Sequence, residues 1–341
     1  MSSCPIPSES EIVLLAHGGG GRLTRKLIQE LFWQELGEPT DGRRHDGVVL
    51  ESRPGRPVLT TDAFVVRPLF FPGGNIGELA VYGTVNDLAM CGARPTELTA
   101  SFILEEGLPL AVLRDVVRSM KQAADRSGVK IVTGDTKVVE RGHGDQLFIC
   151  TTGLGWVEPN VRVGPEQIAV GDQIIVSGDL GRHGIAVMAT REGLTLSGDI
   201  QSDCQELTSQ VQALLGAGIE LHCMRDLTRG GLGAALIEIA QDARLQLNID
   251  SGSIPLSAAV LGAAELFGLD PLLLPCEGRF AAFVPQSQLE TTLAVLPSPF
   301  KARIGEVVQI EAARGKVVLE TELGTQRELE LPLGEQLPRI C

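Results

Sequence analysis

Residues 158–171 are the best candidate for a linker, because they separate two stretches that each read as an α/β unit. The segment contains Pro159 and Pro165, and proline interrupts regular structure because it lacks a backbone donor. A chain of 341 residues is also too long to form one hydrophobic core. We therefore predict a mixed α/β protein with an N-terminal domain, a C-terminal α/β domain and a tail, which span residues 1–158, 159–327 and 328–341.

Hydrophobic periodicity assigns helices and strands within both domains. In the first domain it predicts helices over 23–36, 76–91 and 110–126, and strands over 46–50, 57–62, 129–132 and 147–152. In the second it predicts helices over 181–191, 206–215, 233–240 and 258–267, and strands over 173–178, 280–284 and 317–322. Acidic residues are expected where loops meet these elements.

Charge and cysteine content exclude several classes of protein. A formal net charge of −14 argues against non-specific binding to nucleic acid or anionic membranes, although it leaves room for a local ATP pocket with Mg²⁺. No apolar run is long enough to span a bilayer, and the N-terminus lacks a signal segment. The seven cysteines show no C-x-x-C pairing, which is typical of reduced thiols in a cytoplasmic protein.

A run of four glycines precedes the first predicted helix. Free backbone N–H groups and the positive end of a helix both suit an anion, so this loop is a candidate for holding phosphate. The run is not a P-loop, because no Gly-Lys-Ser/Thr follows it, and a mobile loop is an equally good interpretation. The candidate residues are His17, Gly18, Gly19, Gly20 and Gly21.

Five aspartates lie in glycine- or threonine-flanked turns or at helix ends: Asp46, Asp62, Asp87, Asp135 and Asp226. Carboxylates that are brought together repel one another and acquire raised pKa values unless a cation neutralises them. Hard cations such as Mg²⁺ prefer carboxylate oxygens, often with substrate phosphates completing the shell. The set is therefore a candidate metal site, although a single aspartate is more often an ordinary turn former.

Three further charged residues stand out by their neighbours. Lys137 lies two residues after Asp135, so an extended backbone points both side chains to the same side. Arg229 precedes two glycines at a helix start, which suits phosphate binding, and Glu277 lies between Cys276 and a Gly-Arg pair. Each of the three also fits a surface ion pair.

The chain ends in a cysteine after a segment that shows no period long enough to pack by itself. Pro332 and Pro338 bias this segment towards extended conformations, so the thiol of Cys341 lies at the end of a flexible arm. A frayed terminus is the ordinary interpretation. A reactive arm is the alternative, provided that the rest of the chain supplies a reaction centre for it to enter.

Several of these stretches together resemble the HypE family, the carbamoyl dehydratases of hydrogenase maturation. The family lies in the ATP-binding superfamily of aminoimidazole-ribonucleotide synthetase, selenophosphate synthetase and thiamine-monophosphate kinase. The similarity covers almost the whole chain, and the final Pro-Arg-Ile-Cys separates this family from its relatives. Leu227 and Cys276 depart from the residues common in the family, Pro and Asn, without removing a charge. The matching stretches begin at His17, Phe71, Thr84, Val132, Arg225 and Gly334.

The resemblance implies a two-domain aminoimidazole-ribonucleotide-synthetase-like fold, a homodimer formed through strands of the N-terminal domain, and ATP with Mg²⁺ bound between the domains. It implies that Cys341 receives a carbamoyl group from the carbamoyltransferase HypF. ATP-dependent dehydration then makes a thiocyanate, whose cyano group passes to iron on a HypC–HypD complex. The rivals are a small-molecule kinase or synthetase on the same scaffold, with Cys341 idle, and a non-catalytic scaffold protein.

The chemistry of this reaction suggests, as hypotheses, roles for the candidate residues. Glu277 is the leading base, Lys137 assists proton transfer or holds the phosphorylated oxygen, and Arg229 clamps phosphate. The residues expected to bind the nucleotide are His17, Gly18, Gly19, Gly20, Gly21, Asp62, Asn86, Asp87, Gly134, Asp135, Thr136 and Asp226. The metal shell is expected from Asp46, Asp62, Asp87, Asp135 and Asp226.

Overall fold

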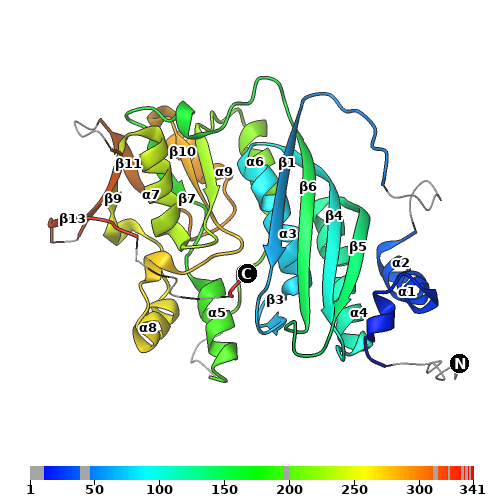
Figure 1. Ribbon diagram of the computed structural model, residues 1–341. Helices are drawn as coiled ribbons and strands as arrows, with labels where there is room; N and C mark the ends of the chain where they lie inside the picture. Colours follow the sequence, from blue (N-terminus) through cyan, green and yellow to red (C-terminus); the bar gives the residue numbers. More distant parts are fainter. Residues whose placement is uncertain are drawn as a thin grey trace, which may run out of the picture.

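The chain folds around two main β-sheets, each covered by helices (Figure 1). The computed structural model describes residues 11–38, 47–194, 200–309, 314–321, 323–331, 334, 337 and 339–341. The predicted metal ligand Asp46 therefore lies outside the described residues, as do Pro332 and Pro338 of the tail. Among the described residues, no helix is long and apolar enough to cross a membrane.

The N-terminal sheet has four strands in the order β1-β6-β4-β5. Its strands are β1 (Arg56–Phe64), β4 (Arg94–Glu105), β5 (Lys130–Val139) and β6 (Leu147–Val157). β4 pairs parallel with β5 and antiparallel with β6. Side chains along β6 alternate between buried and partly exposed, because one face of the sheet is covered by helices and the other is not (Figure 1).

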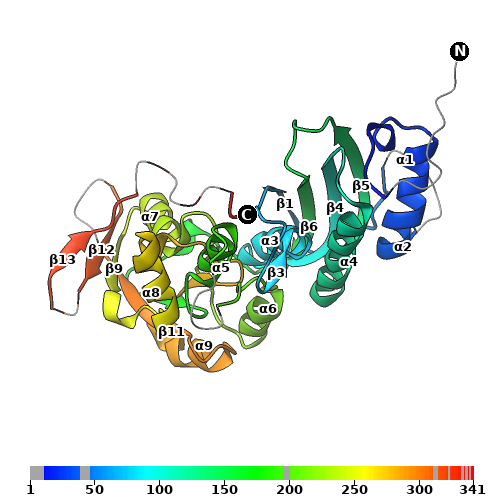
Figure 2. The ribbon, with the colours of Figure 1, turned by 90° about the horizontal axis from the view of Figure 1, so that it is seen from below.

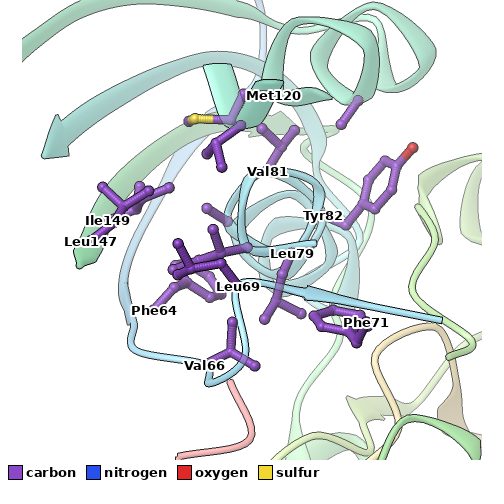
Figure 3. Packing of buried hydrophobic residues seen from close by; sticks show 14 of the residues in the cluster. Phe64, Val66, Leu69, Phe71, Leu79, Val81, Tyr82, Met120, Leu147 and Ile149 are labelled. Atoms are coloured by element: carbon purple, nitrogen blue, oxygen red, sulfur yellow. The ribbon is translucent and has the colours of Figure 1, made fainter. Parts of the chain in front are cut away.

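Two helices, α3 (Ile76–Met90) and α4 (Leu110–Ser127), pack side by side on the covered face (Figure 2). Asn75 caps the N-terminus of α3: its side chain accepts hydrogen bonds from the backbone N–H groups of Gly77 and Glu78. α3 is almost wholly buried, and its side chains form the domain core with Phe64, Met120 and Ile149 (Figure 3). The site described below is built on this rigid helix.

A shorter helical segment and a small hairpin complete the N-terminal domain. The segment consists of α1 (Arg22–Leu27), a π-helical turn (Ile28–Phe32) and α2 (Trp33–Leu36), and Gly37 ends it with φ +95°. The hairpin pairs β2 (Phe70–Phe71) with β3 (Gly74–Asn75).

The C-terminal domain has a seven-stranded sheet in the order β13-β12-β9-β11-β7-β10-β8. Its strands are β7 (Gln173–Val176), β8 (Cys223–Asp226), β9 (Gln246–Asp250), β10 (Phe280–Val284), β11 (Ala302–Val308), β12 (Lys316–Glu320) and β13 (Gln326–Glu328). Its helices are α5 (Arg182–Arg191), α6 (Thr208–Gly216), α7 (Gly231–Ala243), α8 (Ala258–Phe267) and α9 (Leu289–Val295).

The structure confirms most of the predicted elements and corrects two of them. Residues 47–50 form no strand, and Val49 is 96% exposed, because no neighbouring strand pairs with this segment. The strand predicted over 129–132 instead runs to Val139, so Asp135 lies within a strand and not in a loop. Asp62 likewise lies inside β1. The prediction also missed β4, which holds the centre of the N-terminal sheet.

The last residues of the chain dock between the two domains (Figures 1 and 3). On the N-terminal side, the backbone N–H of Val65 donates to Cys341 O at 3.0 Å, and the N–H of Arg67 donates to Arg339 O at 3.3 Å. On the C-terminal side, Arg191 of α5 donates to Arg339 O at 2.6 Å. Ile340 is 3% exposed, so the described end of the tail is packed against both domains.

Candidate active site between the domains

Three of the predicted aspartates come together where α3 meets the C-terminal sheet. Asp62 lies on the covered face of β1, Asp87 on α3 and Asp226 at the end of β8. The carboxyl groups of Asp62 and Asp87 lie close enough to shift each other's pKa, and the charge of Asp226 also acts on Asp87. The structure therefore brings these three residues into one acidic cluster.

Hydroxyl groups orient two members of this cluster. Thr60 donates a hydrogen bond to Asp87 Oδ2 at 2.9 Å, and Thr84 donates to Asp62 Oδ2 at 3.2 Å. Thr84 lies 2.5 Å from the hydroxyl of Thr151, which donates to the backbone of α3. The carboxylates are thus held by the sheet and helix that carry them.

Burial and mutual repulsion raise the pKa values of the acidic cluster. Desolvation, followed by the charges of Asp226 and Asp62, raises the pKa of Asp87 to about 7. Desolvation raises the pKa of Asp226 to about 6, with a further contribution from Asp62, and it also raises the pKa of Asp62. The carboxylates of the cluster therefore repel one another when they are ionised.

The mutual repulsion of these carboxylates and their oxygen donor atoms fit a hard divalent cation such as Mg²⁺. In the part of the chain that the structure describes, no group of three or more histidine, cysteine or acidic residues is placed to hold a metal ion by itself. Such incomplete protein ligation is typical of Mg²⁺, which keeps several waters and shares substrate phosphates.

Glu277 lies beside the acidic cluster in the loop before β10, and it is 3% exposed. Its backbone N–H donates to Asp203 Oδ1 at 3.2 Å, while its Oε1 accepts no hydrogen bond from any described residue. Desolvation, together with the charges of Asp226 and Asp203, raises the pKa of Glu277 well above its ordinary value. A buried carboxyl group with an unused oxygen is suited to taking up or releasing a proton.

Asn86, which is also predicted to bind the nucleotide, joins the domains. Its Nδ2 donates to Gln205 O at 3.0 Å and to Glu277 O at 3.4 Å, and its Oδ1 accepts from the N–H of Leu207 at 2.8 Å. The side chain is buried and both ends of its amide are used by the C-terminal domain. Asn86 therefore positions the loop of Glu277 relative to α3.

Asp135 and Lys137 do not join the acidic cluster within one chain. Across the four strands, the paired residues Asp62, Thr151, Ala100 and Gly134 lie in one line on the covered face. Successive side chains of a strand point to opposite faces, so Asp135, the residue after Gly134, lies on the open face. β5 is also three strands away from β1, a separation of about 15 Å. Asp135 and Lys137 form an exposed ion pair on this far edge, as their spacing predicts.

The remaining nucleotide candidates gather near Asp135. The N–H of Thr136 donates to the Asp135 carboxylate, and a Cβ on Gly134 would lie 2.2 Å from Ala100 O. A Cβ on Gly18 would lie 2.7 Å from the backbone nitrogen of Val138, so the glycine run lies against the same strand. The structure thus has two groups of candidate residues, the acidic cluster and this second group along β5.

Hydrogen bonds within the glycine run restrain its start. The Nδ1 of His17 accepts from Leu14 N at 2.9 Å, and burial lowers the pKa of His17. Thr24 accepts from Gly20 N at 3.0 Å and donates to Ala16 O at 3.3 Å. Side-chain space is open at Gly19, Gly20 and Gly21, where a ligand can approach the backbone.

The tail reaches Glu277 through a histidine of α5. His183 is fully buried, and its Nε2 lies 3.0 Å from Ile340 O and 3.9 Å from Glu277 Oε1. The residue before Cys341 and the carboxyl group of Glu277 therefore share one neighbour. Arg229 is exposed but close enough to Asp62 for its charge to lower the pKa of that carboxyl.

Comparison with known proteins assigns the chain to a family. The models described as "AIR synthase related protein" match residues 44–157 (N-terminal domain) and 169–318 (C-terminal domain). The chain is 46% identical over 333 residues to "Carbamoyl dehydratase HypE" of Azotobacter vinelandii. The match covers 96% of this chain and 97% of that protein. The chain belongs to the HypE family of carbamoyl dehydratases.

Solved HypE structures share its fold. The crystal structure of HypE in complex with ATP matches with a TM-score of 0.92 and 43% identity, covering 96% of this chain and 99% of that one. HypE in a HypE–HypF complex matches with a TM-score of 0.78 and 38% identity, covering 92% and 100%. The sequence resemblance to the HypE family is thereby confirmed.

Four residues of this HypE-family site escaped the sequence analysis. Thr60 lies two residues before Asp62 on the same strand face, and Thr84 lies one helical turn before Asp87, so periodicity alone could have indicated both. Asp203 and His183 carry no local signal, because only the docking of the domains and the tail buries them.

A cavity of about 820 Å³ lies between the domains at the other end of β1, and Arg94, Trp156 and His222 are among its lining residues. None of the predicted site residues lines it. The HypE-family candidates thus lie away from this cavity.

Proposed function

We propose that this protein dehydrates a carbamoyl group carried by its own Cys341, using ATP, to a thiocyanate that supplies cyanide to the iron of a [NiFe]-hydrogenase. The observation that carries the proposal is the docking of the chain's last residues between the domains, where His183 contacts both Ile340 O and the surroundings of Glu277. Relatives named carbamoyl dehydratase and a HypE–ATP complex support it.

The chemistry requires an activated oxygen, because the oxygen of –S–CO–NH₂ is a poor leaving group. Phosphoryl transfer from ATP to this oxygen converts it into phosphate, which can depart. Loss of phosphate and of both nitrogen protons then leaves –S–C≡N, so the products are the thiocyanate, ADP and phosphate. The site must therefore hold phosphoryl oxygens and accept protons.

Glu277 is the leading candidate for the proton acceptor. Its raised pKa makes its carboxylate a stronger base than an exposed glutamate, and its Oε1 has no hydrogen bond to a described residue. Arg229 lies near Asp62 and would clamp phosphoryl oxygens, and Lys137 would assist proton transfer or hold the phosphorylated oxygen.

Asp62, Asp87 and Asp226 would hold Mg²⁺, with Asp46 and Asp135 as further candidates. Bound there with ATP, the cation would neutralise charge that builds up on the transferred phosphoryl group. The raised pKa values of the acidic cluster support this assignment, because a cation would relieve the repulsion that raises them.

A homodimer would complete the site. The open face of the N-terminal sheet exposes Leu59 and Ile103, at 71% and 39%, and it also carries Asp135 and Lys137. Pairing this face with that of a second copy would bury the apolar residues and would bring Asp135 and Lys137 of one copy close to the N-terminal sheet of the other. The separation of the two groups of candidates within one chain supports this arrangement.

The proposed partners are HypF, which would load the carbamoyl group, and a HypC–HypD complex, which would receive the cyano group. A HypE–HypF complex among the similar structures supports the first. The absence of disulfides among the six described cysteines supports a cytoplasmic location.

Mass spectrometry of the C-terminal peptide tests the function directly. The protein is incubated with HypF, carbamoyl phosphate and ATP, and the mass of the Cys341 peptide is followed. We expect a carbamoyl mass gain, then loss of one water once hydrolysable ATP is present, and neither change in Cys341→Ala. An unmodified Cys341 with active HypF would overturn the proposal and favour a small-molecule kinase or synthetase.

A further inference from the structure

His183 contacts the tail from a fully buried position near the start of α5. Its Nδ1 lies 2.9 Å from Ser202 Oγ, its Nε2 lies 3.0 Å from Ile340 O, and its ring meets the edge of Phe71 at a centroid distance of 5.3 Å. Residues from three separate segments therefore fix both the plane of the ring and the position of its two nitrogens.

The partners also fix which nitrogen carries the proton. A backbone carbonyl can only accept, so Nε2 must donate to Ile340 O. Ser202 Oγ accepts from the N–H of Cys204 at 3.1 Å and is free to donate its own proton to Nδ1. The ring is thus a neutral imidazole with its proton on Nε2, and burial, which lowers the pKa of His183, favours the same neutral form.

The hydrogen bond from His183 holds one side of the reactive residue. On the other side, the N–H of Val65 donates to Cys341 O at 3.0 Å. The backbone oxygen atoms before and after the α-carbon of Cys341 are therefore anchored in different domains. With its backbone held at both ends, the direction of the Cys341 side chain is restricted to what its own rotamers allow.

We propose that His183 is a positioning residue, which holds Ile340 O so that the carbamoyl group on Cys341 is presented to the dehydration site. This inference rests on the proposed function. The hydrogen bond exists only while the tail is docked, so His183 acts in dehydration and has no part in loading by HypF. The charged or titratable groups that face the ring are Glu277 and Asp203, and Glu277 Oε1 is too distant, at 3.9 Å, to replace Ile340 O as the acceptor.

The test compares His183→Gln with His183→Phe. The Nε2 of glutamine reaches the place of the histidine Nε2 and can donate to Ile340 O, while phenylalanine keeps the ring shape and removes the donor. Each variant is loaded by HypF, isolated with its carbamoyl group, and mixed with ATP and Mg²⁺. Conversion to the thiocyanate is then followed by mass spectrometry of the C-terminal peptide.

We expect dehydration by His183→Phe to slow by about 10-fold or more, which corresponds to one buried hydrogen bond, while the rate of loading stays within twofold of wild type. His183→Gln should retain dehydration within about threefold. Thermal midpoints of both variants show whether either fails to fold. Ser202→Ala is a second, milder probe: it removes the hydrogen bond to Nδ1 of His183 that favours the proton on Nε2, so dehydration should slow.

Three outcomes would overturn the inference. They are dehydration by His183→Phe at the wild-type rate, equal loss in the Gln and Phe variants when both are folded, and an equal loss of loading and dehydration. Failure of the wild-type protein to form a thiocarbamate or thiocyanate would instead refute the proposed function, so the two failures are distinguishable.

Discussion

Arg339 Nη1 lies 2.6 Å from Asp145 Oδ2, and this ion pair ties the tail to the loop between β5 and β6. Arg67 shares the same carboxylate oxygen at 3.3 Å. Arg339 adopts φ +57°, a left-handed conformation that costs a non-glycine residue about 1–2 kcal/mol. Contacts such as this ion pair therefore have to compensate for backbone strain in the docked tail.

Asp145→Asn should loosen the tail. Both partners are partly exposed, so the expected loss is about 0.5–1 kcal/mol, or a twofold to fivefold shift towards the undocked tail. The rate at which carboxypeptidase removes Cys341 measures this shift. Wild-type protein should show a similar increase at high salt, which screens the pair. Asp115→Asn, which breaks a surface pair on α4, is the matched control, and an effect of equal size there would contradict the assignment.

The pKa values of the acidic cluster predict an unusual dependence of stability on pH. In the folded protein Asp87 and Asp226, with pKa values of about 7 and about 6, retain protons that an unfolded aspartate loses above 3.8. The folded state then binds more protons, so the free energy of unfolding should fall as pH rises from about 4 to about 7. For Asp87 the fall is on the order of 4 kcal/mol at most.

Urea denaturation at pH 5 and pH 8, with and without Mg²⁺, measures this dependence. Mg²⁺ should stabilise the protein at pH 8, where the cluster is ionised, and have little effect at pH 5. Asp87→Asn should flatten the pH dependence and raise stability at pH 8 without Mg²⁺, because it removes one of the repelling charges. An equal effect of Mg²⁺ at both pH values would contradict the cation assignment.

Glu277→Gln should block dehydration and leave the earlier steps intact. Glutamine has nearly the shape of glutamate but cannot accept the nitrogen protons. We expect the carbamoyl form of Cys341 to accumulate with ATP still bound, with thiocyanate formation reduced by about 100-fold or more. Unchanged cyanide formation by a variant that binds ATP fully would remove Glu277 from the role of base.

Asn86→Ala should destabilise the interface between the domains. It leaves the buried N–H of Leu207 without its acceptor, which costs about 1–3 kcal/mol. Chemical denaturation measures the loss, and Asn160→Ala, at an exposed position, is the control. A loss no larger than that of the control would show that the amide of Asn86 does not hold the domains together.

Gly134→Ala should destabilise the N-terminal sheet whether or not nucleotide is present. Its Cβ would lie 2.2 Å from Ala100 O, and relieving such overpacking costs about 1–3 kcal/mol. Gly216→Ala, where the space is open, should have little effect on the thermal midpoint. A stable Gly134→Ala variant that fails only in ATP binding would instead favour direct contact with the nucleotide.

Hydrophobic periodicity predicted most of the helices, but it gave no order of strands in the sheets. The helix over 258–267 coincides with α8, because its periodicity and its terminal Gly268 are both local signals. β4 also had a local signal, since Leu98, Ala100, Phe102 and Leu104 alternate as buried residues along it, but its Arg-Pro start and hydroxyl residues obscured the pattern.

The sequence named the candidate residues but could not give their arrangement in space. Asp62, Asp87 and Asp226 meet because β1, α3 and β8 converge, while Asp135 is separated from them by strand order and by the alternation of faces. Neither follows from position in the chain, because strand order is decided by pairing between distant segments.

The docked tail bridges the two domains through hydrogen bonds to Val65 on one side and to His183 on the other. Linkage makes this bridge reciprocal. If the docked tail stabilises the contact between the two domains, then that contact raises the affinity for the tail by the same free energy. A partner that pulls Cys341 out therefore also loosens the grip of one domain on the other.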